Sequence, residues 1–121
     1  MKKLILILLC SSAAIHAFAQ QSPEKTAQEL ENVSQKYNLD MRHFLRSLPL
    51  STTQFNEQQK QTYCGIVNNY VNNFYSVVDR NRASMPLSYA SMTKRDIISK
   101  VEQSTEMQLL KKYNIRCNYD V

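Results

Sequence analysis

The chain has 121 residues, of which 21% are charged and 43% are hydrophobic, and its formal net charge is +5 at pH 7. This length suits one domain with a modest core, and the small, dispersed basic excess argues against nucleic-acid binding, which usually needs a dense basic stripe. One glycine and three prolines provide too little turn chemistry for an all-β fold.

Residues 1–19 have the three parts of a cleavable secretory signal peptide. The basic start Met1-Lys2-Lys3 precedes an apolar stretch, and Ala17-Phe18-Ala19 matches the small-residue cleavage motif. We expect cleavage between Ala19 and Gln20, which lowers the net charge from +5 to +3 by removing Lys2 and Lys3. The mature chain, residues 20–121, is then a single helical domain that is periplasmic or secreted.

Two rival interpretations of this leader fit its residues less well. A membrane-spanning helix needs about 20 mostly apolar residues, and the apolar stretch is shorter than that. A lipoprotein signal has a small residue before the modified cysteine, whereas Leu9 precedes Cys10. We therefore expect no membrane anchor after cleavage.

The first helical pattern of the mature chain covers residues 23–37. Ser22 is a typical N-cap followed by a proline at the first helical position, and apolar residues then recur every three or four positions. Asn38 is expected to end this helix in a left-handed conformation. A separate short helix starts at Asp40 and ends before Pro49, because the residue before a proline is pushed out of the helical region.

The longest helical pattern covers residues 54–80. Ser51 and Gln54 form a candidate capping box at its start, and a broad apolar stripe and an asparagine-rich face then follow at helical spacing. An unbroken helix of this length would span roughly 40 Å. Because that is long for so small a domain, we expect a bend near Gly65.

The remaining elements are a loop over residues 80–91 and a second amphipathic helix over residues 94–112. Thr93 resembles a capped start for this helix, and Asn114 can end it. Residues 115–117 are predicted to form a short extended tail.

Two cysteines, Cys64 and Cys117, remain after removal of the leader, and exported proteins commonly pair such cysteines. In the chain-entropy model, a bond between them stabilises the fold by roughly 4 kcal/mol. Gly65 is interpreted as admitting close approach of the tail or of a neighbouring helix. Free thiols and an intermolecular bond are the alternatives. The sequence therefore predicts an all-α fold, a small helical bundle of three to four helices stapled by one disulfide.

Few residues of the mature chain are suited to catalysis. Asp40 lies three residues before the single mature histidine, His43, which allows a contact but also fits a capping aspartate with a solvated histidine. Glu102 and Glu106 are a carboxylate pair at i, i+4, for which a solvated helix face is the simpler interpretation. The sequence has neither a glycine-rich phosphate loop nor a C-x-x-C motif. We expect no catalytic activity, no cofactor and no metal site.

Protein recognition is the function class with positive support in the sequence. Seven tyrosines offer contact area and hydrogen bonds at modest entropy cost, although many of them could equally line the core. A basic cluster flanks the 80–91 loop, and we assign partner contact to these arginines and lysines and to the neighbouring tyrosines: Tyr75, Arg80, Arg82, Tyr89, Lys94 and Arg95. Such a surface suits an acidic protein partner. A solvated loop explains the same residues more simply.

These observations predict an exported, non-enzymatic protein-binding module, such as an inhibitor or an immunity-type protein. A small periplasmic enzyme that uses His43 or a carboxylate pair is one alternative, and a periplasmic stress chaperone is another. We expect no nucleic-acid partner. The asparagine-rich face, which includes Asn68 and Asn72, is interpreted as solvated or as the seam of a homodimer.

Overall fold

The computed structural model describes residues 23–119, and the expected leader 1–19 lies outside this range. The described part contains α-helices and one 3-10 helix but no strand. In chain order its elements are α1 (Pro23–Ser47), α2 (Glu57–Asn81), η1 (Arg82–Ser84), α3 (Leu87–Ala90), α4 (Lys94–Glu102) and α5 (Thr105–Lys111). The prediction of a small all-α bundle is confirmed.

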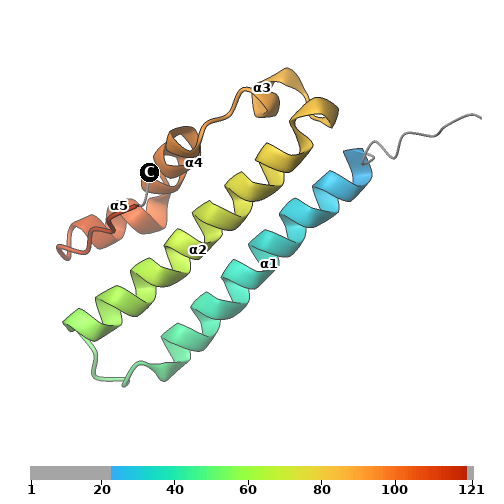
Figure 1. The fold of residues 1–121 in the computed structure, drawn as a ribbon. Helices are drawn as coiled ribbons and strands as arrows, with labels where there is room; N and C mark the ends of the chain where they lie inside the picture. Colours follow the sequence, from blue (N-terminus) through green and yellow to red (C-terminus); the bar gives the residue numbers. More distant parts are fainter. Residues whose placement is uncertain (1–22, 120–121) are drawn as a thin grey trace, which may run out of the picture.

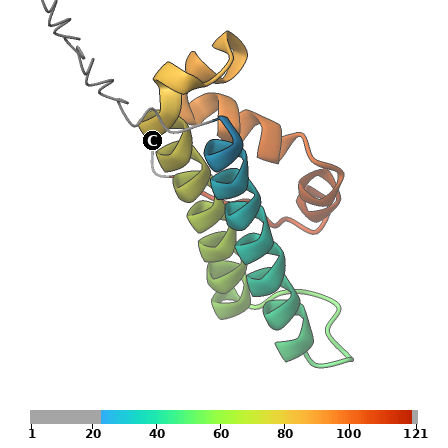
Figure 2. The same ribbon diagram turned by 90° about the vertical axis from the view of Figure 1, so that its right-hand side faces the viewer.

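Helices α1 and α2 form a long antiparallel pair that is the frame of the molecule (Figure 1). The chain then returns through α3, α4 and α5 along one side of α2, and Figure 2 shows α4 and α5 as a second layer beside the pair. The connection between α1 and α2 lies at the end of the pair opposite to α3. Among residues 23–119, no helix is both long enough and apolar enough to cross a membrane.

Helix α1 continues to Ser47, so the predicted stop at Asn38 and the separate short helix after it are wrong. The apolar residues Tyr37, Met41 and Phe44 keep helical spacing through this point, and the last two are buried against α2. The side chains of Lys36 and Asp40 form an ion pair one turn apart across the expected break. Packing of the continuous stripe therefore outweighs the local preference of asparagine for a helix end.

Helix α2 begins later than predicted and is not interrupted. Its N-cap is Asn56, whose side chain accepts a hydrogen bond from the Gln59 backbone at 2.8 Å while the Gln59 side chain accepts one from the Asn56 backbone at 2.9 Å. The proposed capping box at Ser51 and Gln54 is thus wrong. The helix also runs through Gly65 without a break. Gly65 is exposed and a Cβ atom there would meet nothing within 4 Å, so its interpretation as a point of close approach is wrong.

The predicted helix over residues 94–112 is two helices that meet at Ser104. Its start is as expected, because Thr93 and Asp96 form a capping box. The Ser104 side chain caps α5 by accepting a hydrogen bond from the Met107 backbone at 3.3 Å. Asn114 follows α5 with a φ of 60°, the left-handed conformation expected for a residue that ends a helix. The predicted 80–91 loop contains η1 and α3.

Two clusters of buried side chains hold these elements together. The first lies between α5, the C-terminal tail and the half of the long pair that is nearer the α1–α2 connection. Its buried members are Met41, Phe44, Tyr63, Val67, Met107, Ile115 and Cys117. The second lies between α2 and α4, and its buried members are Val71, Val78, Met92 and Ile97. The tail is therefore part of the core and not a loose end.

Candidate partner-binding groove

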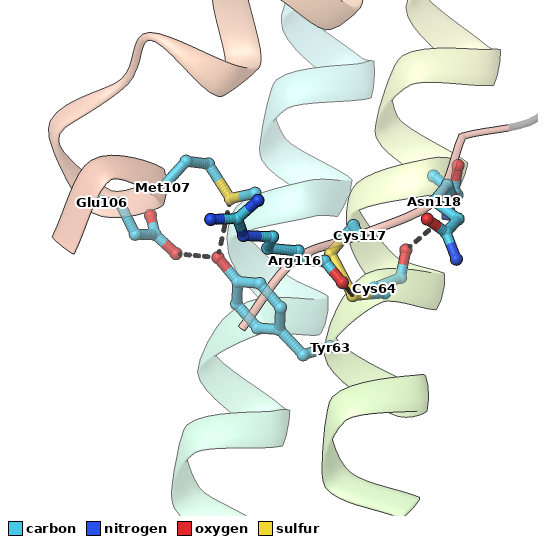
Figure 3. The surroundings of a disulfide bond; sticks show 8 residues. Tyr63, Cys64, Glu106, Met107, Arg116, Cys117 and Asn118 are labelled. Carbon is cyan, nitrogen blue, oxygen red and sulfur yellow. Dashed lines mark hydrogen bonds between the residues drawn. A yellow bond between two sulfur atoms is a disulfide. The ribbon is translucent and has the colours of Figure 1, made fainter. Parts of the chain in front are cut away.

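The C-terminal tail is fixed to α2 by a covalent bond and by a side-chain bridge. The predicted disulfide joins Cys64 on α2 to Cys117, with their Cα atoms 5.2 Å apart (Figure 3). One helical turn further along α2, the Asn68 amide donates hydrogen bonds to the carbonyls of Cys64 and Asn118, both at 3.0 Å. These contacts set the path of the tail, and hence the position of Ile115, beside α5.

Tyr63 holds α5 against α2. Its ring is almost completely buried, and its hydroxyl donates a hydrogen bond to a Glu106 carboxylate oxygen at 2.9 Å and lies 3.3 Å from the sulfur of Met107 (Figure 3). Burial first, and the nearby carboxylate second, raise the pKa of Tyr63 far above its usual value of 10.0. The phenol therefore stays protonated and can keep donating to Glu106.

An apolar groove of about 310 Å³ opens where the end of α1, the connection to α2 and the end of α5 meet. Its floor is made by Leu48, Phe55 and Leu110, which pack on the first core cluster, and by the buried Ile115. These floor residues come from three separate segments of the chain. The groove is therefore a product of the fold, and its floor is continuous with the core.

Large apolar side chains on the rim of this groove are left in water. Leu45 and Tyr113 line the groove with 53% and 57% of their surface exposed, and Leu50 is fully exposed. Single exposed leucines are ordinary on protein surfaces. Several such residues around one apolar hollow form a contiguous patch, which is typical of an interaction site.

The segments that build the groove contain basic residues and no acidic residue. Residues 41–56 and 107–119 contain five cations and no aspartate or glutamate. Arg46 is adjacent to Leu45, and Lys112 is adjacent to Tyr113. Arg42, Arg46 and Lys112 are exposed and form no ion pair within the described part of the chain. The groove thus combines apolar surface with uncompensated positive charge.

Comparison with known proteins found no matching family model, no similar curated protein and no similar solved structure. Function is therefore inferred from the residues and their geometry.

The six residues predicted to contact a partner all lie at the opposite end of the long pair, around α3. Two of them have intramolecular roles. Arg80 forms an ion pair with Glu29 of α1 at 3.1 Å. Arg82 pairs with Asp79 at 3.0 Å and donates hydrogen bonds to the carbonyls of Ala90 and Met92 at 2.8 and 2.9 Å. These two guanidinium groups tie α2 to α1 and to the 90–92 segment.

The other four members of this cluster lie close to the same elements. The Tyr75 ring is half-buried beneath the guanidinium of Arg82, 5.7 Å from its centroid. Tyr89 lines a cavity of about 290 Å³ with residues of α1 and the 84–86 segment. Lys94 and Arg95 begin α4, where Lys94 is half-buried and Arg95 is exposed. Partner contact at this end stays a prediction.

The residues considered for catalysis do not converge on one site. His43 is exposed and lines neither the groove nor the cavities of about 290 and 350 Å³. Asp40 pairs with Lys36 and not with His43. Glu102 and Glu106 lie on different helices, so they do not share one helix face as a continuous helix would require. Glu102 forms an ion pair with Lys111 at 2.8 Å, whereas Glu106 accepts a hydrogen bond from Tyr63.

A further cavity, of about 350 Å³, lies between α1, α2, α4 and the start of α5 and is lined in part by Tyr37, Lys100 and Glu106. Burial, followed by the charge of Glu106, raises the pKa of Tyr37 to about 12, so this phenol is protonated at neutral pH. Within residues 23–119, no group of three or more histidine, cysteine, aspartate or glutamate side chains could hold a metal ion.

Sequence reasoning missed the groove, although one signal for it is visible. Leu48-Pro49-Leu50 places two leucines around a proline in a segment that ends a helix. Apolar residues in such a connection do not belong to the apolar stripe of a helix, so helical periodicity does not explain them. Leu48 turns inward to the core and Leu50 remains in solvent, and this local pattern could have indicated an exposed apolar site.

Proposed function

We propose that this chain is an exported, non-catalytic protein-binding domain that docks its partner in the apolar groove at the α1–α2 connection. The observation that carries this proposal is the set of exposed rim residues, Leu45, Leu50 and Tyr113, around a floor that is continuous with the core. A partner that covers the groove would remove this apolar surface from water, which the isolated domain cannot do by itself.

The free energy available from the rim is large enough to anchor a partner. Full burial of one exposed leucine contributes about 1.5–3 kcal/mol. The fully exposed Leu50 offers this amount and the half-exposed Leu45 roughly half as much, before the cost of association is subtracted. Tyr113 adds a large ring with a hydroxyl group that can hydrogen-bond at the edge of an interface. A few such residues near the centre of an interface usually dominate its affinity.

Export is the part of this proposal that rests on the leader and the cysteines. Residues 1–19 have the pattern of a secretory signal with cleavage between Ala19 and Gln20. The Cys64–Cys117 disulfide is the second support, because such bonds persist in oxidising compartments such as the periplasm or the extracellular space. A mature protein that begins at Gln20 in mass spectrometry of the natural material tests this part directly.

Several features support a non-catalytic role over the enzyme alternative. The groove is lined by no aspartate, glutamate, histidine, cysteine or lysine, and general acid–base or nucleophilic catalysis needs such groups within reach of the substrate. The exposed His43 has no carboxylate partner among residues 23–119. Each residue named for the enzyme alternative is therefore better explained by solvation or by structure.

Site-specific photocrosslinking in cells that naturally produce the protein tests where the partner binds. A photoreactive phenylalanine analogue replaces Leu50 or Tyr113 at the groove, Tyr89 at the α3 end, or Asn72 on the polar face of α2. We expect one discrete protein adduct from the groove positions alone, and its loss when the other groove residue, Leu45, is changed to Asp.

Other outcomes of the same experiment contradict the proposal. An adduct from Tyr89 but not from the groove would transfer the partner site to the basic cluster at α3. An adduct with the mass of two copies of this chain would support the homodimer instead. Many weak adducts from every position would favour a chaperone that touches unfolded clients over a domain with one docking site.

A further inference from the structure

We propose that the segment that docks in this groove is an acidic stretch of a partner protein, which inserts apolar side chains and places carboxylates against a basic rim. This inference rests on the proposed function and adds the chemistry of the partner. We use the name basic rim for three exposed cations that are close in sequence to residues lining the groove: Arg42 and Arg46 in the last turns of α1, and Lys112 directly after α5.

The positive charge at this end is uncompensated because nearby acids are already engaged. Asp40 pairs with Lys36, Glu57 with Lys60 at 3.3 Å, and Glu102 with Lys111 at 2.8 Å. Glu106 accepts the hydrogen bond of the buried Tyr63. No carboxylate among residues 23–119 is within 4.0 Å of the basic groups of the rim.

The basic rim is close in sequence to the exposed apolar residues of the groove. Arg42 lies three residues before Leu45, a spacing that places two side chains on one face of a helix. Arg46 directly follows Leu45, and Lys112 directly precedes Tyr113. A partner that buries the leucines must therefore bring its own flanking residues close to these cations, and complementary charge favours carboxylates there.

The shape of the site favours a protein segment over a bilayer or a small amphiphile. The floor made by Phe55, Leu110 and Ile115 is concave, so a flat lipid surface cannot fill it. A small anion with an apolar tail could fill the hollow and touch Leu50, which lines it, but it would leave most of this fully exposed side chain in water. A folded partner can insert side chains into the hollow and cover the rim at once.

The absence of tryptophan from the chain makes a direct binding experiment feasible. The probe is a peptide of about 15 residues with a central tryptophan and leucine as apolar anchors and glutamates on either side. Two sister peptides keep the anchors and replace every glutamate with glutamine or with lysine. Entry of the tryptophan into the groove of the disulfide-bonded mature protein shifts its emission to shorter wavelength, which gives the affinity by titration.

We expect the glutamate peptide to bind about tenfold more tightly than the glutamine peptide at low salt and the lysine peptide to bind least. The difference should shrink at high salt because ions screen exposed charges. Arg46→Gln and Lys112→Gln should each weaken the glutamate peptide roughly 1.4- to 5-fold, the range for one exposed ion pair, and leave the glutamine peptide unchanged. Lys100→Gln on α4 has the same charge change and is the matched control.

The possible results separate failure of this inference from failure of the docking site. Equal affinities for the glutamate and glutamine peptides, both lost in Leu50→Asp, would overturn the acidic partner and keep the groove. Binding that Leu50→Asp does not alter would remove the groove itself. No emission shift with any peptide, or sedimentation of the protein with phosphatidylglycerol vesicles that requires Arg46 and Lys112, would overturn the acidic protein partner, the latter in favour of a membrane.

Discussion

Gly65→Ala is expected to make the protein more stable, which is the opposite of what the sequence interpretation of this glycine implied. Gly65 lies inside α2, is exposed, and does not have a positive φ. A Cβ atom at this position meets no atom within 4 Å. The substitution therefore introduces no clash and removes no packing contact, and the change in stability comes from helix propensity alone.

The size of the effect follows from the cost of glycine in a helix. Glycine is about 0.8–1.0 kcal/mol less favourable than alanine in a helix interior, partly because it gives the unfolded chain more conformational freedom to lose. For a domain of 60–100 residues, 1 kcal/mol corresponds to a Tm change of about 4–8 °C. We therefore expect the Tm of Gly65→Ala to rise by several degrees.

Thermal and urea unfolding followed by circular dichroism, with the disulfide intact, measure this change. Asn69→Ala is the matched control, because Asn69 is also exposed on α2 and the gain from asparagine to alanine is smaller than from glycine. An unchanged or lower Tm for Gly65→Ala, with the expected small rise for Asn69→Ala, would refute the reasoning. It would mean that another part of the molecule touches Gly65 or that α2 is not regular there.

Three further predictions concern contacts that stabilise the fold. Reduction of the Cys64–Cys117 disulfide should lower the free energy of unfolding by roughly 4 kcal/mol in the chain-entropy model, and identical urea midpoints with and without reductant would contradict this. Thr93→Ala should lower the Tm by a few degrees through loss of the helix cap. Hydrogen bonds from the Thr93 backbone first, and from its hydroxyl second, hold the pKa of Asp96 low, so loss of the hydroxyl should raise this pKa part of the way. The cap stabilises the fold above the ordinary carboxyl pKa and is lost as pH falls. An Asp96 pKa that does not move in an NMR titration would argue against this. Because burial and then Glu106 raise the pKa of Tyr63, stability should be complete below pH 10 and decline above it by about 1.4 kcal/mol per pH unit for this group. Tyr63→Phe should reduce that slope, and equal slopes in urea unfolding above pH 10 would count against the burial of this phenol.

Helices were predictable from apolar spacing, but their ends depended on competing local signals. Both Ser51 with Gln54 and Asn56 with Gln59 match a capping box in the sequence. The structure uses the second because residues 49–52 form a turn, in which the Thr52 backbone donates to the Pro49 carbonyl at 2.9 Å. Ser51 lies inside that turn and cannot begin a helix. The sequence contained both signals and no means to rank them.

The division of the predicted 94–112 helix shows a different limit. The apolar residues of this region fit one helix or two, and Ser104 followed by Glu106 has the pattern of a capped helix start. What decides between the two is distant in sequence. The break at Ser104 allows α5 to turn so that Met107 and Glu106 reach Tyr63 on α2, and this contact spans more than 40 residues of chain.

The site was harder to predict than the fold because it depends on which charges are neutralised. The cluster around the 80–91 loop is the clearest basic run in the sequence, yet Arg80 reaches Glu29, which is 51 positions away. Arg82 is occupied by Asp79 and by two backbone carbonyls. A run of basic residues in the sequence therefore indicates a basic binding surface only if the fold leaves those residues without intramolecular ion pairs.

A basic residue that forms intramolecular contacts indicates a structural role, whereas unpaired basic residues beside exposed apolar side chains indicate a binding surface. At the α3 end, Arg82 contributes to the fold, because its guanidinium lies over the Tyr75 ring and donates hydrogen bonds to the backbone of the 90–92 segment. At the groove, Arg46 and Lys112 form no ion pair within residues 23–119, and the neighbouring Leu45 and Tyr113 remain half-exposed. Neither group gains anything from the isolated domain, since the cations lack counter-charges and the apolar side chains lack a cover. A partner that provides both at once would explain their shared position, whereas a purely structural role would explain neither.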